Sequence, residues 1–478
     1  MVFSSYEFIF VFLPVILLGY FLLSKTKTTF WQHLFLVVGS LFFYAYFNVY
    51  YLFIILASIV INYFLSIQIK AVSVKNNTGK SRFFLILGIV FNIGMLGYYK
   101  YYDFFIGNIN AVFQTSFHLK HLLLPLGIRF FTFQQFSFLI AIYNGESKSE
   151  NFIEYALFVS FFPQLVAGPI VLYDEMMPQF KDASRRNIDY GNLAQGVYIF
   201  TIGLFKKIVI ADTVALFANN GFNDPAQGYL AAWAAVLAYT LQIYFDFSGY
   251  SDMAIGLGKM FNINIPINFR SPYKSKSVTE FWKRWHITLG RALGTYVYIP
   301  LGGNRKGRAR TYLNLFATFI VSGLWHGAAW TFVLWGAFHG FFVVMERILG
   351  SLLEKIPNWI RMAATFVIVS ALWVLFRAES FAKAMEMYSS MIKFSTPGFS
   401  ALAGLAVDGL IGFPAMLNIA YVSGILLILT LIVFTSRNTI EKAGVFQTNT
   451  KNLILTAALF TISVIHLSKE SIFIYFNF

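Results

Sequence analysis

The chain has 478 residues, of which 58% are hydrophobic and only 12% are charged, about half the charged fraction of ordinary soluble proteins. Together with a mean hydropathy of +0.65, this composition excludes a water-soluble globular protein. Cysteine is absent, which excludes disulfides, thiolate metal sites and any thioester formed on a cysteine of this chain. The formal net charge of +15 is typical of basic cytoplasmic loops in a membrane protein, and we do not interpret it as nucleic-acid binding.

Stretches without charged residues recur along the chain at the length that a bilayer requires. The strongest are residues 8–24, 28–69, 83–99, 226–245, 311–345, 409–436 and 452–468, and the second and fifth are each long enough for two helices. Weaker stretches lie at 122–143, 155–173, 193–211 and 362–376. The first stretch ends at Lys25 without a small-residue cleavage site, so we expect it to be retained. We predict an all-α integral membrane protein with about 11 to 13 helices.

Two prolines indicate a break in one of the weaker stretches. Pro163 and Pro169 flank Gln164 and Gly168, and a proline inside a helix removes a hydrogen bond and kinks the helix. Non-helical backbone at membrane depth is tolerated only where protein or a water-filled cavity covers it. We expect such broken or re-entrant segments to surround a thinned central tunnel. Because no repeat or soluble segment is visible, residues 1–478 are interpreted as one polytopic membrane domain.

Basic residues are concentrated between Arg270 and Arg310, where ten of the 36 lysines and arginines occur against a single acid, Glu280. This segment is predicted to face the cytoplasm. The loop 436–451 is also basic, so the last helix is expected to carry the C-terminus outward. By the same rule, the lysines after the first helix place the N-terminus outside. With both ends of the chain outside, the number of full spans must be even.

Two of the seven histidines, His326 and His339, lie in the uncharged stretch 311–345, where ionisable side chains are costly and usually functional. Burial disfavours a charged imidazole, so His326 is expected to be neutral, the form that a general base needs. The alternative is a histidine that joins two helices by hydrogen bonds. The small residues Gly323 and Gly327 favour a site, because they permit close approach. His339 lies on another face of a straight helix and is interpreted as structural.

His286 and Asp246 are the other candidates for polar chemistry. His286 follows a tryptophan inside the basic segment and is either a site residue or an interfacial histidine. Asp246 lies near Asp252 at the end of an apolar stretch. Such a pair of acids either binds a cation or transfers protons, or it caps the next helix or pairs with arginines. No set of histidines and carboxylates has the spacing of a metal site, so no metal is expected.

The basic segment also suits a phosphate-rich acyl donor such as a coenzyme A thioester. Phosphates bind Lys and Arg, and a membrane-embedded histidine would activate the acceptor hydroxyl. The positive-inside rule explains the same charges without any ligand, so both interpretations stay open. The candidate donor-binding or tunnel residues are Trp282, Lys283, Arg284, Trp285, Asn304, Arg305, Trp325 and Asp246.

Several longer motifs carry a family resemblance. They include PLGIRFFTFQ at 125–134, SFFPQLVAGPI at 160–170, YTLQIYFDFSGYSDMAIGLGKM at 239–260, NFRSPYKSKSVTEFWKRWHITL at 268–289 and SGLWHGAAWTFVLWGAFHG at 322–340. In these segments the chain resembles the membrane-bound O-acyltransferase family, in particular its bacterial branch of alginate O-acetyltransferase-like proteins. Together the matching segments cover most of the chain.

The resemblance implies that His326 is the essential membrane histidine of the family and that His286 is a second catalytic position. It also implies acetyl coenzyme A as the donor, bound from the cytoplasmic side, and an acyl group delivered to the outside through the tunnel. The expected location is the cytoplasmic (inner) membrane of a bacterium. The expected partners are membrane lipid and an extracytoplasmic SGNH-like O-acetyltransferase.

The last six residues, 473–478, form the pattern F-x-Y-F-x-F. One interpretation is an aromatic anchor at the membrane interface. The pattern also resembles the C-terminal hexapeptide of acyltransferase systems that modify cell-surface polymers, whose tyrosine is thought to accept the acyl group. This resemblance implies that Tyr475 takes acetyl on its phenol oxygen after His326 removes the proton, and then passes it to the partner. A phenyl ester is a good onward donor because phenolate leaves more easily than an alkoxide.

The expected function is O-acetylation of a cell-envelope polymer, with peptidoglycan first, alginate or another exopolysaccharide second, and D-alanylation of teichoic acid third. A transporter or channel is the alternative from another class, in which His326, Asp246 and Arg129 would line a pore. A scaffold for the partner enzyme is a third alternative, and it predicts that substitution of His326 leaves acetylation intact.

Overall fold

The structure is a computed structural model that describes residues 1–74, 77–147, 151–225, 228–394, 398–406, 415–467 and 473. Over these residues every regular element is a helix, and the one extended pairing is an isolated antiparallel bridge between Phe269 and Trp285. Six of the described helices are long and apolar enough to cross a membrane, and three shorter apolar helices accompany them. The chain is therefore an all-α integral membrane protein, as its composition predicts.

Two compact units alternate along the sequence. Unit 1 comprises Met1–Thr201, Ser251–Pro266 and Gln447–Thr456, and unit 2 comprises Ile202–Tyr250, Ile267–Phe446 and Ala457–Phe478, counting the described residues of each range. Three helices contribute residues to both units, namely α10 (Tyr190–Phe205), α12 (Tyr229–Met260) and α22 (Thr450–Ile465).

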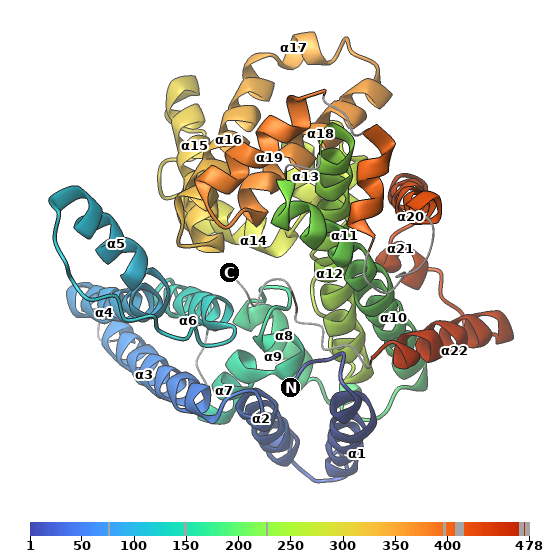
Figure 1. Cartoon of the computed structure of the whole chain (residues 1–478). Helices are drawn as coiled ribbons and strands as arrows, with labels where there is room; N and C mark the ends of the chain where they lie inside the picture. Colours follow the sequence, from blue (N-terminus) through green and yellow to red (C-terminus); the bar gives the residue numbers. More distant parts are fainter. Residues whose placement is uncertain are drawn as a thin grey trace. The chain divides into compact units, whose positions relative to one another are not determined.

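Unit 1 contains most of the N-terminal half of the chain (Figure 1). A π-helical turn, η1 (Phe8–Phe12), runs into α1 (Leu13–Leu23). The elements that follow are α2 (Phe30–Ala45), α3 (Val49–Val74), α4 (Thr78–Leu96), η2 (Gly97–Tyr101), α5 (Tyr102–Phe113), α6 (Ile128–Tyr143), α7 (Phe152–Ser160), α8 (Phe162–Leu165), α9 (Tyr173–Lys181) and η3 (Ala183–Arg185).

Buried amide and hydroxyl side chains join the first long helices of unit 1. Asn62 on α3 and Asn92 on α4 are buried, and each donates to the side-chain oxygen of the other, at 3.3 and 2.6 Å. Gln135 on α6 donates to the Ser58 hydroxyl of α3 at 3.1 Å and accepts from the Tyr155 hydroxyl of α7 at 3.2 Å. Polar bonds of this kind fix the pairing of apolar helices. Accordingly α3, α4 and α6 lie side by side (Figure 1).

One arginine holds the turn between α1 and α2. Arg186, which follows η3, donates to the side-chain oxygen of Gln32 at 2.9 Å. Its Nη2 also donates to the carbonyl oxygens of Ser24, Thr26 and Thr28, at 3.2, 2.8 and 3.1 Å. Carbonyl groups at and beyond a helix end lack intrahelical partners, so the guanidinium satisfies a set of acceptors that the turn itself leaves open.

The proline-containing segment is broken, which confirms the prediction. Helix α7 ends at Ser160, α8 covers only Phe162–Leu165, and residues 166–172 are not helical. The backbone N–H of Phe162 donates to the buried Ser40 hydroxyl of α2 at 3.1 Å. The segment itself is buried, so protein covers its non-helical backbone.

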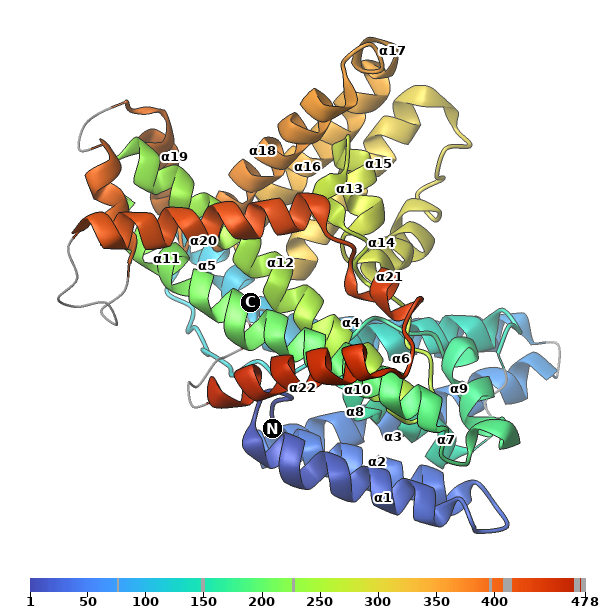
Figure 2. The same cartoon turned by 90° about the vertical axis from the view of Figure 1, so that its right-hand side faces the viewer.

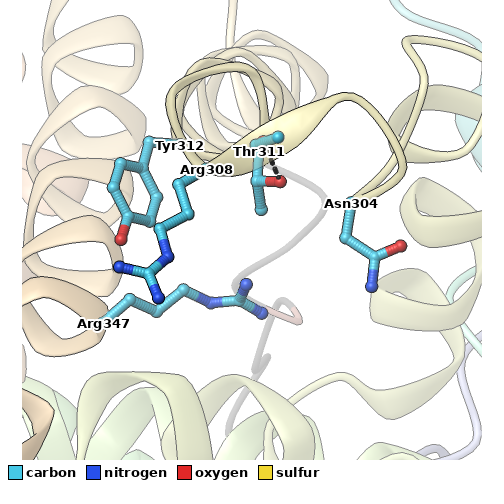
Figure 3. Close-up of a pocket in the computed structure, with 6 residues that line it drawn as sticks. Asn304, Arg308, Thr311, Tyr312 and Arg347 are labelled. Carbon is cyan, nitrogen blue, oxygen red and sulfur yellow. Dashed lines mark hydrogen bonds between the residues drawn. The ribbon is translucent and has the colours of Figure 1, made fainter.

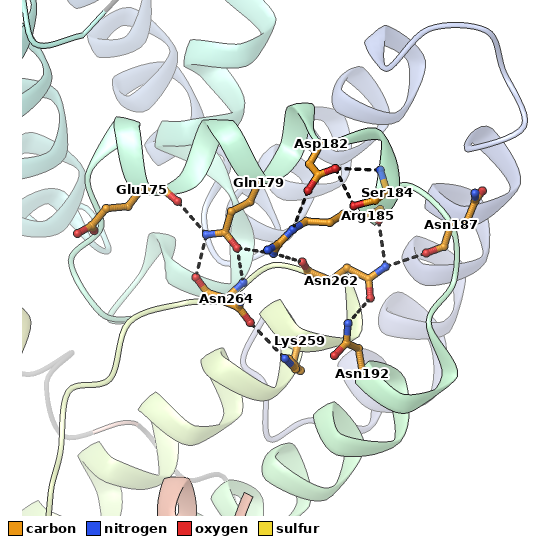
Figure 4. Close-up of polar contacts among 10 residues, drawn as sticks. All are labelled: Glu175, Gln179, Asp182, Ser184, Arg185, Asn187, Asn192, Lys259, Asn262 and Asn264. Carbon is orange, nitrogen blue, oxygen red and sulfur yellow. Dashed lines mark hydrogen bonds and ion pairs between the residues drawn. The ribbon is translucent and has the colours of Figure 1, made fainter. Parts of the chain in front are cut away.

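A second polar cluster ties the segment after α9 to the end of α12 (Figure 4). Arg185 donates to the side-chain oxygen of Gln179 at 2.9 Å and to the carbonyl oxygen of Asn262 at 3.0 Å. Asn262 in turn donates to the carbonyl oxygens of Arg185 and Asn187, at 3.0 and 2.8 Å. It has a φ of 62°, and asparagine is one of the few residues that adopt this left-handed conformation readily. The cluster therefore fixes how the chain leaves α12.

Unit 2 contains the segments that the sequence analysis marks as chemically important. Its remaining elements are η4 (Lys206–Ala211), α11 (Asp212–Asn223), η6 (Pro272–Lys274), α13 (Val278–Arg284), α14 (Ile287–Leu293), η7 (Gly294–Tyr298), α15 (Gly307–His326), α16 (Trp330–Ile348), α17 (Gly350–Leu353), α18 (Asn358–Arg377), α19 (Phe381–Ile392), η8 (Gly398–Leu405), α20 (Ala415–Thr435) and α21 (Thr439–Ala443). Within this unit α15, α16 and α18 lie side by side in both views (Figures 1 and 2).

Helices α15 and α16 form a tightly packed hairpin. A Cβ atom added at Gly323 would collide with the Phe332 carbonyl, and one at Gly336 would collide with the Phe319 carbonyl. A Cβ atom at Gly340 would make a tight contact, 3.1 Å from Phe319 and 3.2 Å from Phe316. Glycine is required at Gly323 and Gly336 because any side chain there would separate the two backbones.

The predicted membrane stretches agree well with the observed helices. Residues 28–69 form two helices, α2 and α3, and residues 311–345 form α15 and α16, as predicted. Helix α12 is longer than expected, since it continues beyond residue 245 to Met260. Short amphipathic helices such as α9 and α19 were not predicted, because their polar faces leave no uncharged stretch.

We predict that Arg186→Ala lowers the free energy of unfolding by about 3 kcal/mol, because several charge-assisted hydrogen bonds are lost together. Arg186→Lys should give an intermediate loss, since an ammonium group cannot reach the same set of carbonyls. Thermal unfolding of the detergent-purified protein measures both. The exposed Lys25→Ala variant is the control and should stay within about 0.5 kcal/mol. An Arg186→Ala variant as stable as that control would contradict the role of this arginine.

Candidate functional site

His326 is the last residue of α15, at the point where the chain reverses into α16. Residues 327–329 are not helical, and the imidazole is buried. Its Nδ1 lies 2.6 Å from the carbonyl oxygen of Ser322, one turn back. A carbonyl only accepts hydrogen bonds, so in the neutral ring Nδ1 carries the proton and Nε2 carries the lone pair. This is the tautomer that a general base needs.

Aromatic rings enclose His326. The ring centroids of Trp325, Trp335 and Phe376 lie 5.0, 4.9 and 5.4 Å from that of the imidazole. Trp335 is fully buried and stacks on Trp373 of α18 at 5.7 Å. Such a wall excludes water, which favours the neutral imidazole and strengthens any electrostatic interaction made inside it.

His339 belongs to the same cluster, which the sequence analysis missed. Its ring lies 4.8 Å from Trp335, the neighbour of His326. Its Nδ1 accepts a hydrogen bond of 3.1 Å from the indole N–H of Trp282 on α13. On a straight helix the two histidines would lie on different faces, but the break at 327–329 lets residues from two helices approach one tryptophan. The sequence signal available was the Gly-Ala-Ala segment after His326.

His286 lies in a strained backbone position between α13 and α14. Its φ of 47° is left-handed, a conformation that costs a non-glycine residue on the order of 1–3 kcal/mol and is most often found at functional sites. Two backbone hydrogen bonds pair residues 268–270 with residues 284–287 and hold this turn: Ile287 N–H to Asn268 at 3.0 Å, and Arg270 N–H to Arg284 at 3.0 Å. The strain is therefore imposed by the surrounding structure.

Asn268 orients the His286 ring. Its side-chain oxygen accepts from the backbone N–H and the hydroxyl of Thr288, at 3.2 and 2.7 Å, and lies 3.3 Å from His286 Nδ1. Since this oxygen acts as an acceptor, Nδ1 of His286 carries the proton and Nε2 the lone pair. Asn268 is a positioning residue that the sequence analysis did not identify, because it lies 18 residues before the histidine.

Trp325 separates the two principal histidines. Its ring lies 5.8 Å from His286 and 5.0 Å from His326. On its other side His286 contacts Phe247 of α12, with ring centroids 4.8 Å apart. The structure thus brings His286, Trp325 and His326 together, with Trp282 and His339 beyond Trp335. A predicted catalytic pair and two of the predicted tunnel residues share one buried aromatic site.

Of the remaining predicted donor-binding residues, only Trp285 joins the aromatic wall, through Trp373. Trp285 is buried and packs on Trp373 at 5.1 Å. Lys283 and Arg305 are exposed, and Arg284 pairs with Glu280 at 2.7 Å. Asn304 lines an open pocket just before α15 begins. A helix of the length of α15 spans about 30 Å, so this pocket lies at the opposite end of the helix from His326.

Asp246 forms a buried ion pair. Its carboxylate lies 2.5 Å from Nζ of Lys207 on η4, which also contacts Asp212 at 3.0 Å. Asp246 does not cap a helix, because α12 continues through it. Pairing neutralises a charge that would otherwise be costly in the membrane, so a structural role accounts for this aspartate.

Tyr475 lies outside the described residues. The first residue of the hexapeptide, Phe473, is described and buried. Its ring stacks on Tyr250 at 4.6 Å and contacts Phe247 at 5.9 Å. Over the described part of the chain, no group of three or more His, Asp or Glu side chains is arranged to hold a metal ion.

Comparison with known proteins decides the family. Residues 7–378 match the membrane-bound O-acyltransferase family. The chain belongs to this family. It is 41% identical to a peptidoglycan O-acetyltransferase of Helicobacter pylori, with all of this chain and 98% of that protein covered. This O-acyltransferase is also 40% identical to a probable alginate O-acetylase of Pseudomonas putida, with 100% of both chains covered.

A more distant relative shares part of the chain. A teichoic acid D-alanyltransferase of Streptococcus thermophilus is 29% identical over 46% of this chain and 56% of its own length. Family membership and the two full-length relatives identify the chain as an acyltransferase, as the sequence analysis predicts.

We predict that Asn268→Ala lowers kcat of acyl transfer about 10- to 100-fold, because the His286 ring loses the acceptor that orients it. Asn268→Asp keeps an oxygen at this position and should restore most of the activity. Steady-state kinetics in detergent micelles measures both variants. An alanine variant with wild-type kcat, or an aspartate variant as poor as alanine, would show that Asn268 does not position His286.

For the ion pair, we expect Asp246→Asn to destabilise the protein by about 3 kcal/mol, because Lys207 is left with only the more exposed Asp212. The matched Asp212→Asn variant should cost less. Replacing both partners, as Lys207→Met with Asp246→Leu, should recover stability and activity. Recovered stability with activity still absent would instead assign Asp246 a role in the reaction.

Proposed function

We propose that this enzyme transfers an acetyl group from acetyl coenzyme A on the cytoplasmic side to an acceptor outside, for O-acetylation of a cell-envelope polymer. The observation that carries the proposal is His326: a buried imidazole, held by Ser322 with its lone pair on Nε2, at the break between two helices. This arrangement suits removal of a hydroxyl proton, and family membership supports an acyl group as the cargo.

The proposed reaction is a single acyl substitution. Nε2 of His326 takes the proton of the acceptor hydroxyl while the oxygen attacks the thioester carbonyl carbon. The carbon–sulfur bond breaks, an oxygen ester forms, and the protonated imidazole returns its proton to the departing thiolate. The products are free coenzyme A and the acetylated acceptor, and the imidazole regains its starting form. His286, on the other side of Trp325, would orient the acceptor or the donor carbonyl.

The first acceptor in this proposal is the phenol of Tyr475. Phe473, two residues earlier, lies against Tyr250 and Phe247, and the ring of Phe247 is 4.8 Å from His286. This contact supports a route from the hexapeptide to the histidines. An acetyl phenyl ester would then pass to a hydroxyl of an extracytoplasmic SGNH-like O-acetyltransferase, with release of the Tyr475 phenol.

The polymer favoured by the comparisons is peptidoglycan. The full-length relative from Helicobacter pylori is named a peptidoglycan O-acetyltransferase, and the relative from Pseudomonas putida a probable alginate O-acetylase. Alginate or another exopolysaccharide is therefore the second candidate, and D-alanylation of teichoic acid the third. In each case the enzyme would act in the cytoplasmic membrane of a bacterium, and the polymer itself would contact the partner protein.

Peptide mass spectrometry after incubation with labelled acetyl coenzyme A tests the proposal. We expect label on the C-terminal peptide of the wild type and none in Tyr475→Phe or His326→Ala. Tyr250→Phe, which keeps the ring beside Phe473, serves as the control and should be labelled normally.

Each other result has a defined meaning. If the His326→Ala variant were still labelled, His326 would not be the general base. Consumption of acetyl coenzyme A with partner protein, but without label on the chain, would replace the tyrosine relay with direct transfer. Transport of a solute by reconstituted protein, without any acetyl transfer, would favour the transporter or channel.

A further inference from the structure

An open pocket of about 440 Å³ lies where α15 begins, at the end of the α15–α16 hairpin opposite His326. It is lined by Asn304, Gly307, Arg308, Thr311, Tyr312 and Arg347. Figure 3 shows Arg347 reaching from α16 toward Arg308 of α15, with Asn304 across the opening. The volume is within the range of small-molecule sites, about 300–1,000 Å³.

The pocket carries two positive charges and no negative one. The guanidinium groups of Arg308 and Arg347 are exposed, and neither makes a hydrogen bond or ion pair with any residue of the described chain. The nearest acid in sequence, Glu346, is already used: its carboxylate accepts from the N–H groups of Val278 and Thr279 at the start of α13. Because both side chains are exposed, water screens their mutual repulsion, and an anion bound between them would pair with both.

Other groups in the pocket also favour an anion. The N-terminus of α15, which is 20 residues long, presents unpaired backbone N–H groups and the positive end of the helix dipole. The Asn304 amide supplies a further donor, and the Tyr312 ring offers a face for stacking. Arg binds phosphate through two parallel hydrogen bonds and also stacks on flat rings. This combination suits a nucleotide phosphate more closely than a single inorganic ion.

We propose that this pocket binds the phosphate groups of the acyl donor, the adenosine 3′,5′-bisphosphate part of coenzyme A. The assignment of the occupant rests on the proposed function. Arg308 belongs to the basic segment that the positive-inside rule places in the cytoplasm, where the donor is made. The hairpin leads from the pocket past His339 and Trp282 to His326. A donor with a long flexible arm between its phosphates and its thioester is needed to bridge this distance, and coenzyme A has such an arm.

A phospholipid head group carries the same phosphate chemistry, so the experiment must separate the two sources. The protein is reconstituted in nanodiscs of phosphatidylcholine and titrated calorimetrically with adenosine 3′,5′-bisphosphate. We expect the double variant Arg308→Gln with Arg347→Gln to bind at least 10-fold more weakly than wild type. Arg310→Gln removes the same charge from an exposed site of the same helix outside the pocket, and it should bind as wild type does.

Kinetics provide the second readout. In the double variant KM for acetyl coenzyme A should rise about 10-fold with kcat unchanged, whereas KM for acetyl pantetheine, which lacks the nucleotide, should not change. A bisphosphate affinity equal in wild type and double variant would overturn the assignment. The assignment would also be overturned if the double variant changed only the amount of phosphatidylglycerol retained in discs of mixed lipid. The occupant of the pocket would then be a lipid. Because binding is measured without turnover, absence of acetyl transfer by the wild type overturns the proposed function separately.

Discussion

The close packing of α15 on α16 is the constraint on which the site depends. Gly323 and Gly336 bring the two backbones into contact, and any side chain there would push the helices apart. This contact sets the position of the break at 327–329 and therefore of His326 and Trp335 on either side of it. Hydrophobic attraction between helices is weak in a bilayer, so packing geometry of this kind has to replace it. The His326 imidazole is held in place by the hairpin as a whole.

A second constraint is the cost of polar groups inside a membrane. The protein meets it at several places by pairing buried groups with one another: Asn62 with Asn92, Asp246 with Lys207, and the broken segment at Phe162 with Ser40. Three histidines of the site, His326, His286 and His339, each have one ring nitrogen engaged by a defined partner: Ser322, Asn268 and Trp282 respectively. Such partners fix the tautomer as well as the position of a ring. The same hydrogen bonds therefore supply a partner for a buried ring nitrogen and determine which of the two nitrogens carries the proton.

Sequence reasoning predicted the parts of this protein that depend on local composition. Uncharged stretches of bilayer length located the membrane helices, and prolines located the break at α8. The position of His326 in an uncharged stretch made it a candidate, and the structure shows that it is buried. Sequence reasoning failed where a contact joins residues far apart in the chain. His339 was predicted to lie on a different face from His326 because the two were treated as part of one straight helix. The non-helical segment 327–329 places them on two helices instead. Asn268 carries no signal of its own, since an asparagine before a basic segment resembles any loop residue. Arg347 lies 37 residues after the end of the basic segment at Arg310, so only the folded hairpin places it beside Arg308.

The interlocked glycines also determine how this region can change over evolution. Two helices whose backbones touch cannot slide past each other, so the separation between Arg308 and His326 is counted in residues of α15. One inserted residue would lengthen that interval by about 1.5 Å and rotate one end against the other by about 100°. The number of residues in α15 therefore fixes both the distance and the relative orientation of Arg308 and His326. Substitutions on the outer face of the hairpin can accumulate freely, while a change of length would uncouple its two ends.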